Sequence, residues 1–83
     1  MLNVSVVSPE RTLFEGEAES VVAPAFDGEV GILTHHAPML TLLGNGRLRI
    51  RAAGNERSFT VAGGFLEVAD DRVRIVTERA ETI

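Results

Sequence analysis

Two adjacent histidines, His35 and His36, are the first residues whose chemistry suggests a metal or catalytic site. In an extended chain, neighbouring side chains point to opposite faces, so these two imidazoles cannot easily share one ion. A zinc site also needs a third protein ligand, and no His, Asp or Glu stands nearby at ligand spacing. We interpret the pair as part of a loop entering a turn at Pro38, with one imidazole hydrogen-bonded inside and the other exposed. A histidine at a protein interface is the alternative.

The remaining polar residues do not form the pattern of an active site. No serine lies in a Gly-x-Ser-x-Gly elbow beside a base. The absence of cysteine excludes thiol nucleophiles, thiolate metal sites and disulfides. The carboxylates of Glu15, Glu17 and Glu19 would project from one strand face, which is more typical of a solvated surface than of glycoside chemistry. We therefore expect a protein that is not an enzyme and has no catalytic residue, metal or cofactor.

A short acidic segment, residues 27–31, is a more informative candidate. Two glycines, Gly28 and Gly31, bracket the acidic Glu29, and we expect them to shape a tight turn that holds its carboxylate outward. An ordinary hairpin loop explains the same residues equally well. The functional alternative is a carboxylate presented to an arginine of a partner protein, where charge-assisted pairing gives specificity.

The elements that position these residues are strands, because the dominant hydrophobic period is two. Arginines alternate with apolar residues over residues 47–52, and residues 2–6, 58–62 and 72–76 repeat the alternation. Turn signals separate segments of about five to eight residues, and no helical period lasts for three turns. This pattern predicts an all-β sandwich or flattened barrel of short antiparallel strands.

Glycines inside strand-like runs mark expected irregularities. Gly16 suggests a bulge that bends its strand. Gly63 and Gly64 resemble a phosphate loop only superficially, because no lysine and no helix follow them. We interpret this glycine pair as a place of positive φ or of close approach between backbones.

Size and charge bound the remaining possibilities. The chain of 83 residues makes one small domain, residues 1–83, with a net charge of −4 that argues against nucleic-acid binding. We expect no signal peptide and no membrane-spanning segment, so that any membrane association comes through a partner. All eight basic side chains are arginine, which reflects either compositional bias or the use of guanidinium groups in ion pairs and interfaces.

Three segments together identify a family. Residues 28–33, 36–40 and 63–68 read GEVGIL, HAPML and GGFLEV, and in this order and spacing they closely resemble the N-terminal domain of the epsilon subunit of bacterial F-type ATP synthases. Residues 6–10 and 73–76 fit the same pattern. The resemblance covers essentially the whole chain. One departure is His35, where the family often has Gly or Asn.

The resemblance implies a flattened sandwich of two antiparallel sheets with about ten short strands. Family members typically continue into a C-terminal helical hairpin, whereas this sequence stops at Ile83. We therefore expect a short form that contains only the sandwich, or a shortened piece of a longer chain. The hairpin carries the ATPase inhibition of the family and, in some members, ATP binding, so neither function is expected here.

The resemblance also implies a mechanical role. Such a subunit belongs to the rotating central stalk, at the cytoplasmic face of the bacterial membrane. It grips the gamma subunit and rests on the c-ring, so that proton-driven rotation is coupled to ATP synthesis. The residues implied at the c-ring are Gly28, Glu29, Val30 and Gly31. The residues implied at the gamma subunit are Ser8 and His36, together with Met39 and Leu40 as apolar contacts. The alternative for Met39 and Leu40 is a place in the core.

A rival hypothesis from another class remains open on the residues alone. It is a free-standing β-sandwich module that binds a ligand or metal through His35, His36 and Glu29. Stoichiometric zinc binding would distinguish it from the rotor subunit. A small hydrolase is the weakest alternative, because no nucleophile and base occur together in a recognisable motif.

Overall fold

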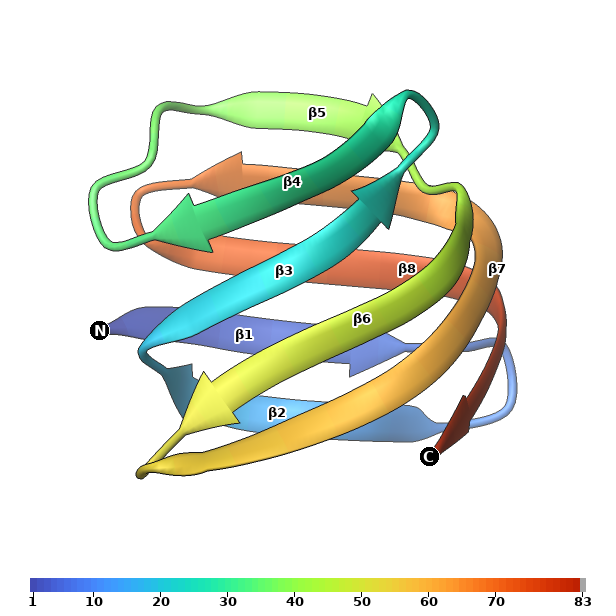
Figure 1. Ribbon diagram of the computed structural model, residues 1–83, viewed down its shortest axis with the longest axis horizontal. Helices are drawn as coiled ribbons and strands as arrows, with labels where there is room; N and C mark the ends of the chain where they lie inside the picture. Colours follow the sequence, from blue (N-terminus) through green and yellow to red (C-terminus); the bar gives the residue numbers. More distant parts are fainter. Residues whose placement is uncertain (83) are drawn as a thin grey trace.

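A computed structural model describes residues 1–82 as a β-sandwich without a helix among them, which confirms the predicted fold class (Figure 1). These residues include no helix that could cross a membrane. The strands are β1 (Leu2–Val7), β2 (Thr12–Ala18), β3 (Ser20–Ala25), β4 (Gly28–Leu33), β5 (Met39–Leu42), β6 (Asn45–Ala52), β7 (Asn55–Ala69) and β8 (Arg72–Thr82).

The strands form one hydrogen-bonded sheet that folds over into two layers. The strand order is β2-β1-β8-β7-β6-β3-β4, and β5 pairs with β7 beside this path. Every neighbouring pair is antiparallel except β1 and β8, which are parallel. The sheet is not closed, because the path ends at β2 on one side and at β4 on the other.

Strand β7 joins the two layers. Its residues 55–62 pair with β6, and its residues 65–68 pair with β5. Figure 1 shows β7 curving from the layer of β3, β4 and β6, here called the β6 layer, to the layer of β1, β2, β5 and β8, here called the β8 layer. The described residues contain eight strands rather than about ten, because β7 and β8 continue through the bend without a break.

The bend of β7 depends on its two glycines. Gly63 and Gly64 have φ angles of 71° and 108°, in the region that L side chains rarely adopt. A Cβ atom at Gly64 would lie 1.9 Å from the carbonyl oxygen of Val76 on β8. The prediction of positive φ and close backbone approach is therefore confirmed.

The core fills the space between the two layers. Along β6, Leu48 and Ile50 are fully buried while Arg47 and Arg51 are exposed, so the predicted alternation holds. The other strands contribute in the same way, because every second side chain of a strand faces inward. The buried apolar side chains are Leu2, Val4, Val6, Ala18, Val21, Ala23, Ile32, Leu43, Leu48, Ile50, Phe59, Val61, Leu66, Val68, Val73 and Ile75.

The expected bulge at Gly16 is wrong. Gly16 pairs in regular register with Val4, and the register shifts instead between Val6 and Val7. Val6 pairs with Phe14 and Val7 with Thr12, which leaves one additional residue in β2 beside the β1–β2 turn. The irregularity therefore lies beside the β1–β2 turn and not at Gly16. Gly16 lies beside the ring of Phe14, whose Cζ is 3.9 Å from an added Cβ.

Candidate functional site

The acidic segment lies on the edge strand β4. A two-residue turn joins β3 to β4, since Ala25 pairs with Gly28. Gly28 has a φ of 130°, so it shapes this turn as expected. Gly31 does not, because its φ is not positive and an added Cβ would meet no atom within 4 Å. Glu29 extends from the outer face, with 59% of its side chain exposed.

Glu29 already has a partner within the chain. The Nη2 atom of Arg49 lies 3.4 Å from each of its two carboxylate oxygens. Arg49 belongs to β6, so this contact reaches across β3 on the outer face of the β6 layer. Both side chains are solvent-accessible, and such pairs contribute about 0–1 kcal/mol. An arginine on a partner protein would have to share the Glu29 carboxylate with Arg49.

Other arginines also use their planar guanidinium groups within the chain. Arg51 lies 3.9 Å from Glu56. The guanidinium carbon of Arg57 lies 5.5 Å from the ring centre of Phe14 and 5.4 Å from that of Phe59. These distances suit cation–π contacts. The interpretation that guanidinium groups form specific contacts therefore holds for these arginines.

The two histidines lie in a loop between β4 and β5, as predicted. The backbone N–H of His35 donates a 2.6 Å hydrogen bond to Oδ1 of Asp71, and its ring Nε2 lies 3.8 Å from Oδ2 of the same residue. His35 has a φ of 70°, a conformation that Gly and Asn adopt more easily. His36 is half-buried, with Nδ1 2.7 Å from the carbonyl oxygen of Ala37. Within residues 1–82, no three His, Cys, Asp or Glu side chains cluster as metal ligands would.

The structure does not bring the four residues expected at the gamma subunit together. Ser8 lies in the β1–β2 turn and His36 in the β4–β5 loop, and Figure 1 places these two connections at opposite ends of the molecule. Met39 and Leu40 are neighbours on β5 with opposite orientations. Met39 packs against the core, whereas Leu40 is 71% exposed.

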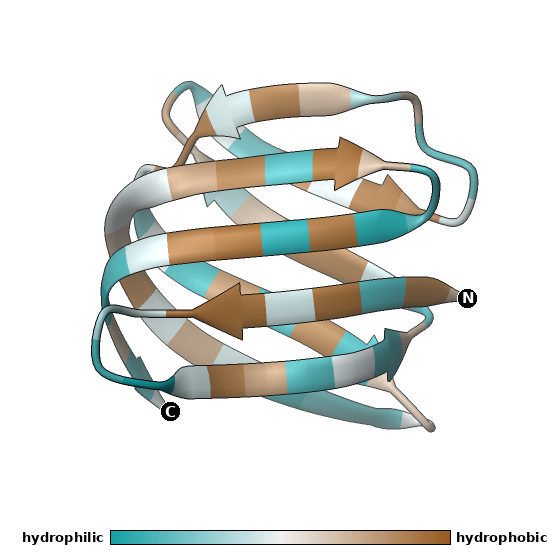
Figure 2. Cartoon of the chain, turned by 180° about the vertical axis from the view of Figure 1, so that it is seen from behind, coloured by the Kyte–Doolittle hydropathy of each residue, from teal (hydrophilic) through white to brown (hydrophobic). Residues whose placement is uncertain are grey.

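An apolar surface that sequence reasoning missed covers one end of the β8 layer. Leu42 is 63% exposed on β5 and pairs with Phe65 on β7, which in turn pairs with Val76 on β8. Val76 pairs with Val7 on β1, so one row of apolar side chains crosses four strands. In Figure 2 the β8 layer lies in front, and brown segments mark the apolar residues of both its faces. We call these four residues together with Leu40 the outer apolar surface.

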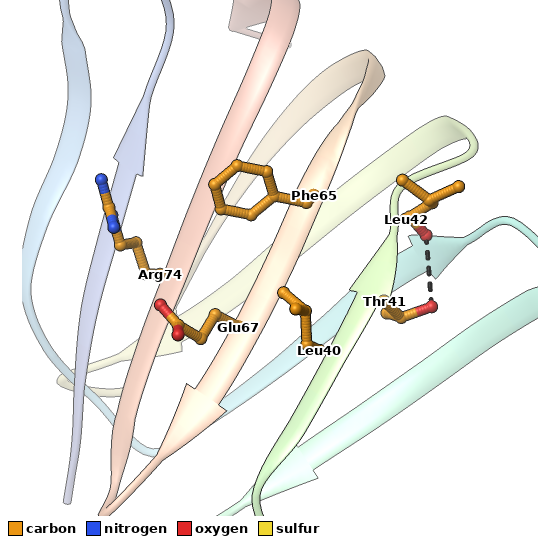
Figure 3. A pocket seen from close by; sticks show the side chains of 6 residues that line it. All are labelled: Leu40, Thr41, Leu42, Phe65, Glu67 and Arg74. Carbon is orange, nitrogen blue, oxygen red and sulfur yellow. Dashed lines mark hydrogen bonds between the residues drawn. The ribbon is translucent and has the colours of Figure 1, made fainter.

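A shallow hollow of about 530 Å³ opens on this surface (Figure 3). The sequence carries a signal for the outer apolar surface in the pairs Val6-Val7 and Ile75-Val76, where two successive strand residues are apolar. Such a break in the alternation indicates a strand that is covered on both faces. The hollow is lined by Leu40, Thr41, Leu42, Phe65, Glu67 and Arg74.

Residues 1–83 match the family model of the ATP synthase delta/epsilon chain, beta-sandwich domain. The chain is 45% identical over 80 residues to the ATP synthase epsilon chain of a Synechococcus strain, covering 96% of this chain and 58% of that protein. It is 48% identical over 77 residues to the epsilon chain of Leptospira borgpetersenii, covering 93% of this chain and 61% of that protein.

A solved structure has the same fold. It is the Euglena gracilis mitochondrial ATP synthase, solved as OSCP/F1/c-ring, of which one chain matches with a TM-score of 0.90 at 23% identity. The match covers 98% of this chain and 52% of that one. The matched part of this chain spans about six tenths of the full length of the two bacterial relatives, namely 58% and 61%. From the family match along residues 1–83 and the identity to these relatives, this chain belongs to the delta/epsilon chain family of ATP synthases, whose β-sandwich domain it forms.

Proposed function

We propose that this chain is a non-catalytic rotor subunit of an ATP synthase. In this role, residues 1–83 form one domain that binds the gamma subunit and rests on the c-ring, so that proton-driven rotation is coupled to ATP synthesis. The observation that carries the proposal is the family match over residues 1–83. The subunit would be peripheral, held at the cytoplasmic face of a bacterial membrane by the complex.

The outer apolar surface is the best candidate for the face that binds the gamma subunit. Leu40 and Leu42 are 71% and 63% exposed, and Leu40 is one of the residues that the resemblance implies at this contact. Fully burying a leucine side chain contributes about 1.5–3 kcal/mol. Covering the exposed part of each leucine would therefore contribute about 1–2 kcal/mol. Contiguous exposed apolar patches on soluble proteins often mark protein-binding sites, which supports a protein partner here.

Binding of the gamma subunit should raise the melting temperature of the chain. At a gamma concentration one hundred times Kd, mass action adds about 2.7 kcal/mol to the free energy of unfolding. In a domain of this size, 1 kcal/mol corresponds to roughly 4–8 °C. We therefore expect Tm to rise by at least about 10 °C in a thermal scan with saturating gamma subunit. An unchanged Tm would overturn the proposed function.

The c-ring contact is expected to depend weakly on Glu29. Replacing it with glutamine removes a charge that an exposed arginine of the ring would pair with, which is worth about 0–1 kcal/mol. Glu29→Gln should thus weaken binding of the chain–gamma complex to detergent-solubilised c-rings about two- to fivefold at low salt.

Glu56→Gln is the matched control for this measurement. Glu56 also pairs with an arginine of β6, at 3.9 Å, but it lies on β7 and away from the β3–β4 hairpin. Its substitution should leave the affinity for the ring unchanged. Equal losses for both variants would show a general charge effect, and the assignment of Glu29 to the ring contact would then be wrong.

A further inference from the structure

Arg74, on the outer face of the β8 layer, has no ion-pair partner within the described part of the chain, and neither does its neighbour Arg72. Arg74 is exposed on β8, directly opposite Glu67 on β7 and Ser5 on β1. Among residues 1–82, no carboxylate oxygen lies within 4.0 Å of its guanidinium nitrogens. Figure 3 shows the guanidinium extending away from the carboxylate of Glu67. Its donors therefore remain available to another molecule.

Arg74 also occupies a central position on this face. It lines the hollow of about 530 Å³ with Leu40 and Phe65. It lines two further hollows of about 310 and 350 Å³, one over β1 beside Ser5 and one beside the β7–β8 turn. A protein that covers the outer apolar surface would consequently cover part of this side chain as well.

We propose that Arg74 anchors the gamma subunit by binding a carboxylate that lies beside the apolar residues of its docking segment. This inference rests on the proposed function and adds the chemistry of the partner: apolar side chains over Leu40, Leu42 and Phe65, with an Asp or Glu next to them. A guanidinium fork matches a carboxylate with two parallel hydrogen bonds. Arginine is also enriched among the residues that dominate interface energies, where surrounding apolar contacts exclude water.

The unoccupied hydrogen-bond donors of Arg74, rather than the charges around it, favour an acidic group at this position. Glu67 and Glu15 lie in the same cross-strand row, on either side of Arg74 and Ser5. These carboxylates weaken the attraction of Arg74 for an acidic partner, but they do not occupy its hydrogen-bond donors. A basic partner group would face an unpaired guanidinium, whereas a carboxylate gains charge-assisted hydrogen bonds.

The test compares Arg74→Gln with Arg72→Gln in calorimetric titrations of the full chain with the gamma subunit of the same organism. Arg72 is a matched control, because it lies two residues away on β8, is also exposed and faces the same side, but does not line the hollow beside Leu40. We expect Arg74→Gln to raise Kd at least tenfold and Arg72→Gln to change it less than twofold. Arg74→Lys should fall between them, because lysine keeps the charge and loses the fork.

The possible outcomes distinguish a failure of the role of Arg74 from a failure of the proposed function. The ratio of Kd values for Arg74→Gln and the native chain should fall as salt is raised. The role of Arg74 would be overturned if both glutamine variants bound as tightly as the native chain, or if both lost affinity equally. The proposed function would still stand in either case if Leu40→Ser/Leu42→Ser weakens binding. If the native chain does not bind the gamma subunit, the proposed function fails and the inference fails with it.

Discussion

Replacing Gly64 with alanine is expected to destabilise the fold by more than about 4 kcal/mol, which is a large part of the 5–15 kcal/mol typical of a whole domain. The added Cβ would lie 1.9 Å from the Val76 carbonyl oxygen and 2.8 Å from Cα of Thr77. These are backbone atoms of β8, so relief requires separating β7 from β8 at the bend. The φ of 108° adds strain for any L side chain. Urea unfolding monitored by circular dichroism measures the loss.

Two other glycines serve as controls for this prediction. Gly63→Ala meets only the end of the Glu78 side chain, 2.6 Å from the added Cβ, which can rotate away. We expect it to cost about 1–2 kcal/mol through its φ of 71°. Gly31→Ala has open space and no positive φ, so its effect should be within about 1 kcal/mol. A Gly64→Ala variant as stable as Gly31→Ala would show that the two strands can separate at the bend without loss.

The double substitution Leu40→Ser/Leu42→Ser is expected to weaken binding of the gamma subunit by about two orders of magnitude. Each leucine would contribute about 1–2 kcal/mol on being covered, and a tenfold change in Kd corresponds to about 1.4 kcal/mol. Because the two side chains are 71% and 63% exposed in the free chain, their removal should leave the melting temperature of the isolated chain nearly unchanged. Calorimetry or surface-based binding measures the affinity.

Leu33→Ser is the matched control for the two leucines. Leu33 is 64% exposed, but it lies on β4 in the β6 layer. Its substitution should change the affinity for the gamma subunit less than about threefold, since an exposed leucine outside the contact contributes no burial. If Leu33→Ser weakened binding as much as the double substitution, the gamma subunit would dock on the β6 layer instead.

The sequence alone was sufficient for features that depend on neighbouring residues. The alternation of residues 47–52 specified a strand with Leu48 and Ile50 inward, because a slip of one residue would bury arginines. The glycines at 63 and 64 indicated positive φ or a close backbone approach, because glycine has no Cβ and adopts positive φ readily. The three motifs in order identified the family, and the glycines on either side of Glu29 indicated that this residue is exposed.

Only the tertiary structure decided which surfaces these strands create. The apolar row on the outer face combines residues from four strands, namely Val7, Leu42, Phe65 and Val76. This row forms only because β5 pairs with β7, β7 with β8 and β8 with β1. The sequence also did not reveal the ion pair between Glu29 and Arg49, because Arg49 is 20 residues away and reaches Glu29 across β3. Strand pairing is set by long-range contacts in the core, while the local period of two reveals only the two faces of each strand. The fold class therefore followed from local pattern, whereas the outer apolar surface and the unpaired Arg74 followed from register between distant segments.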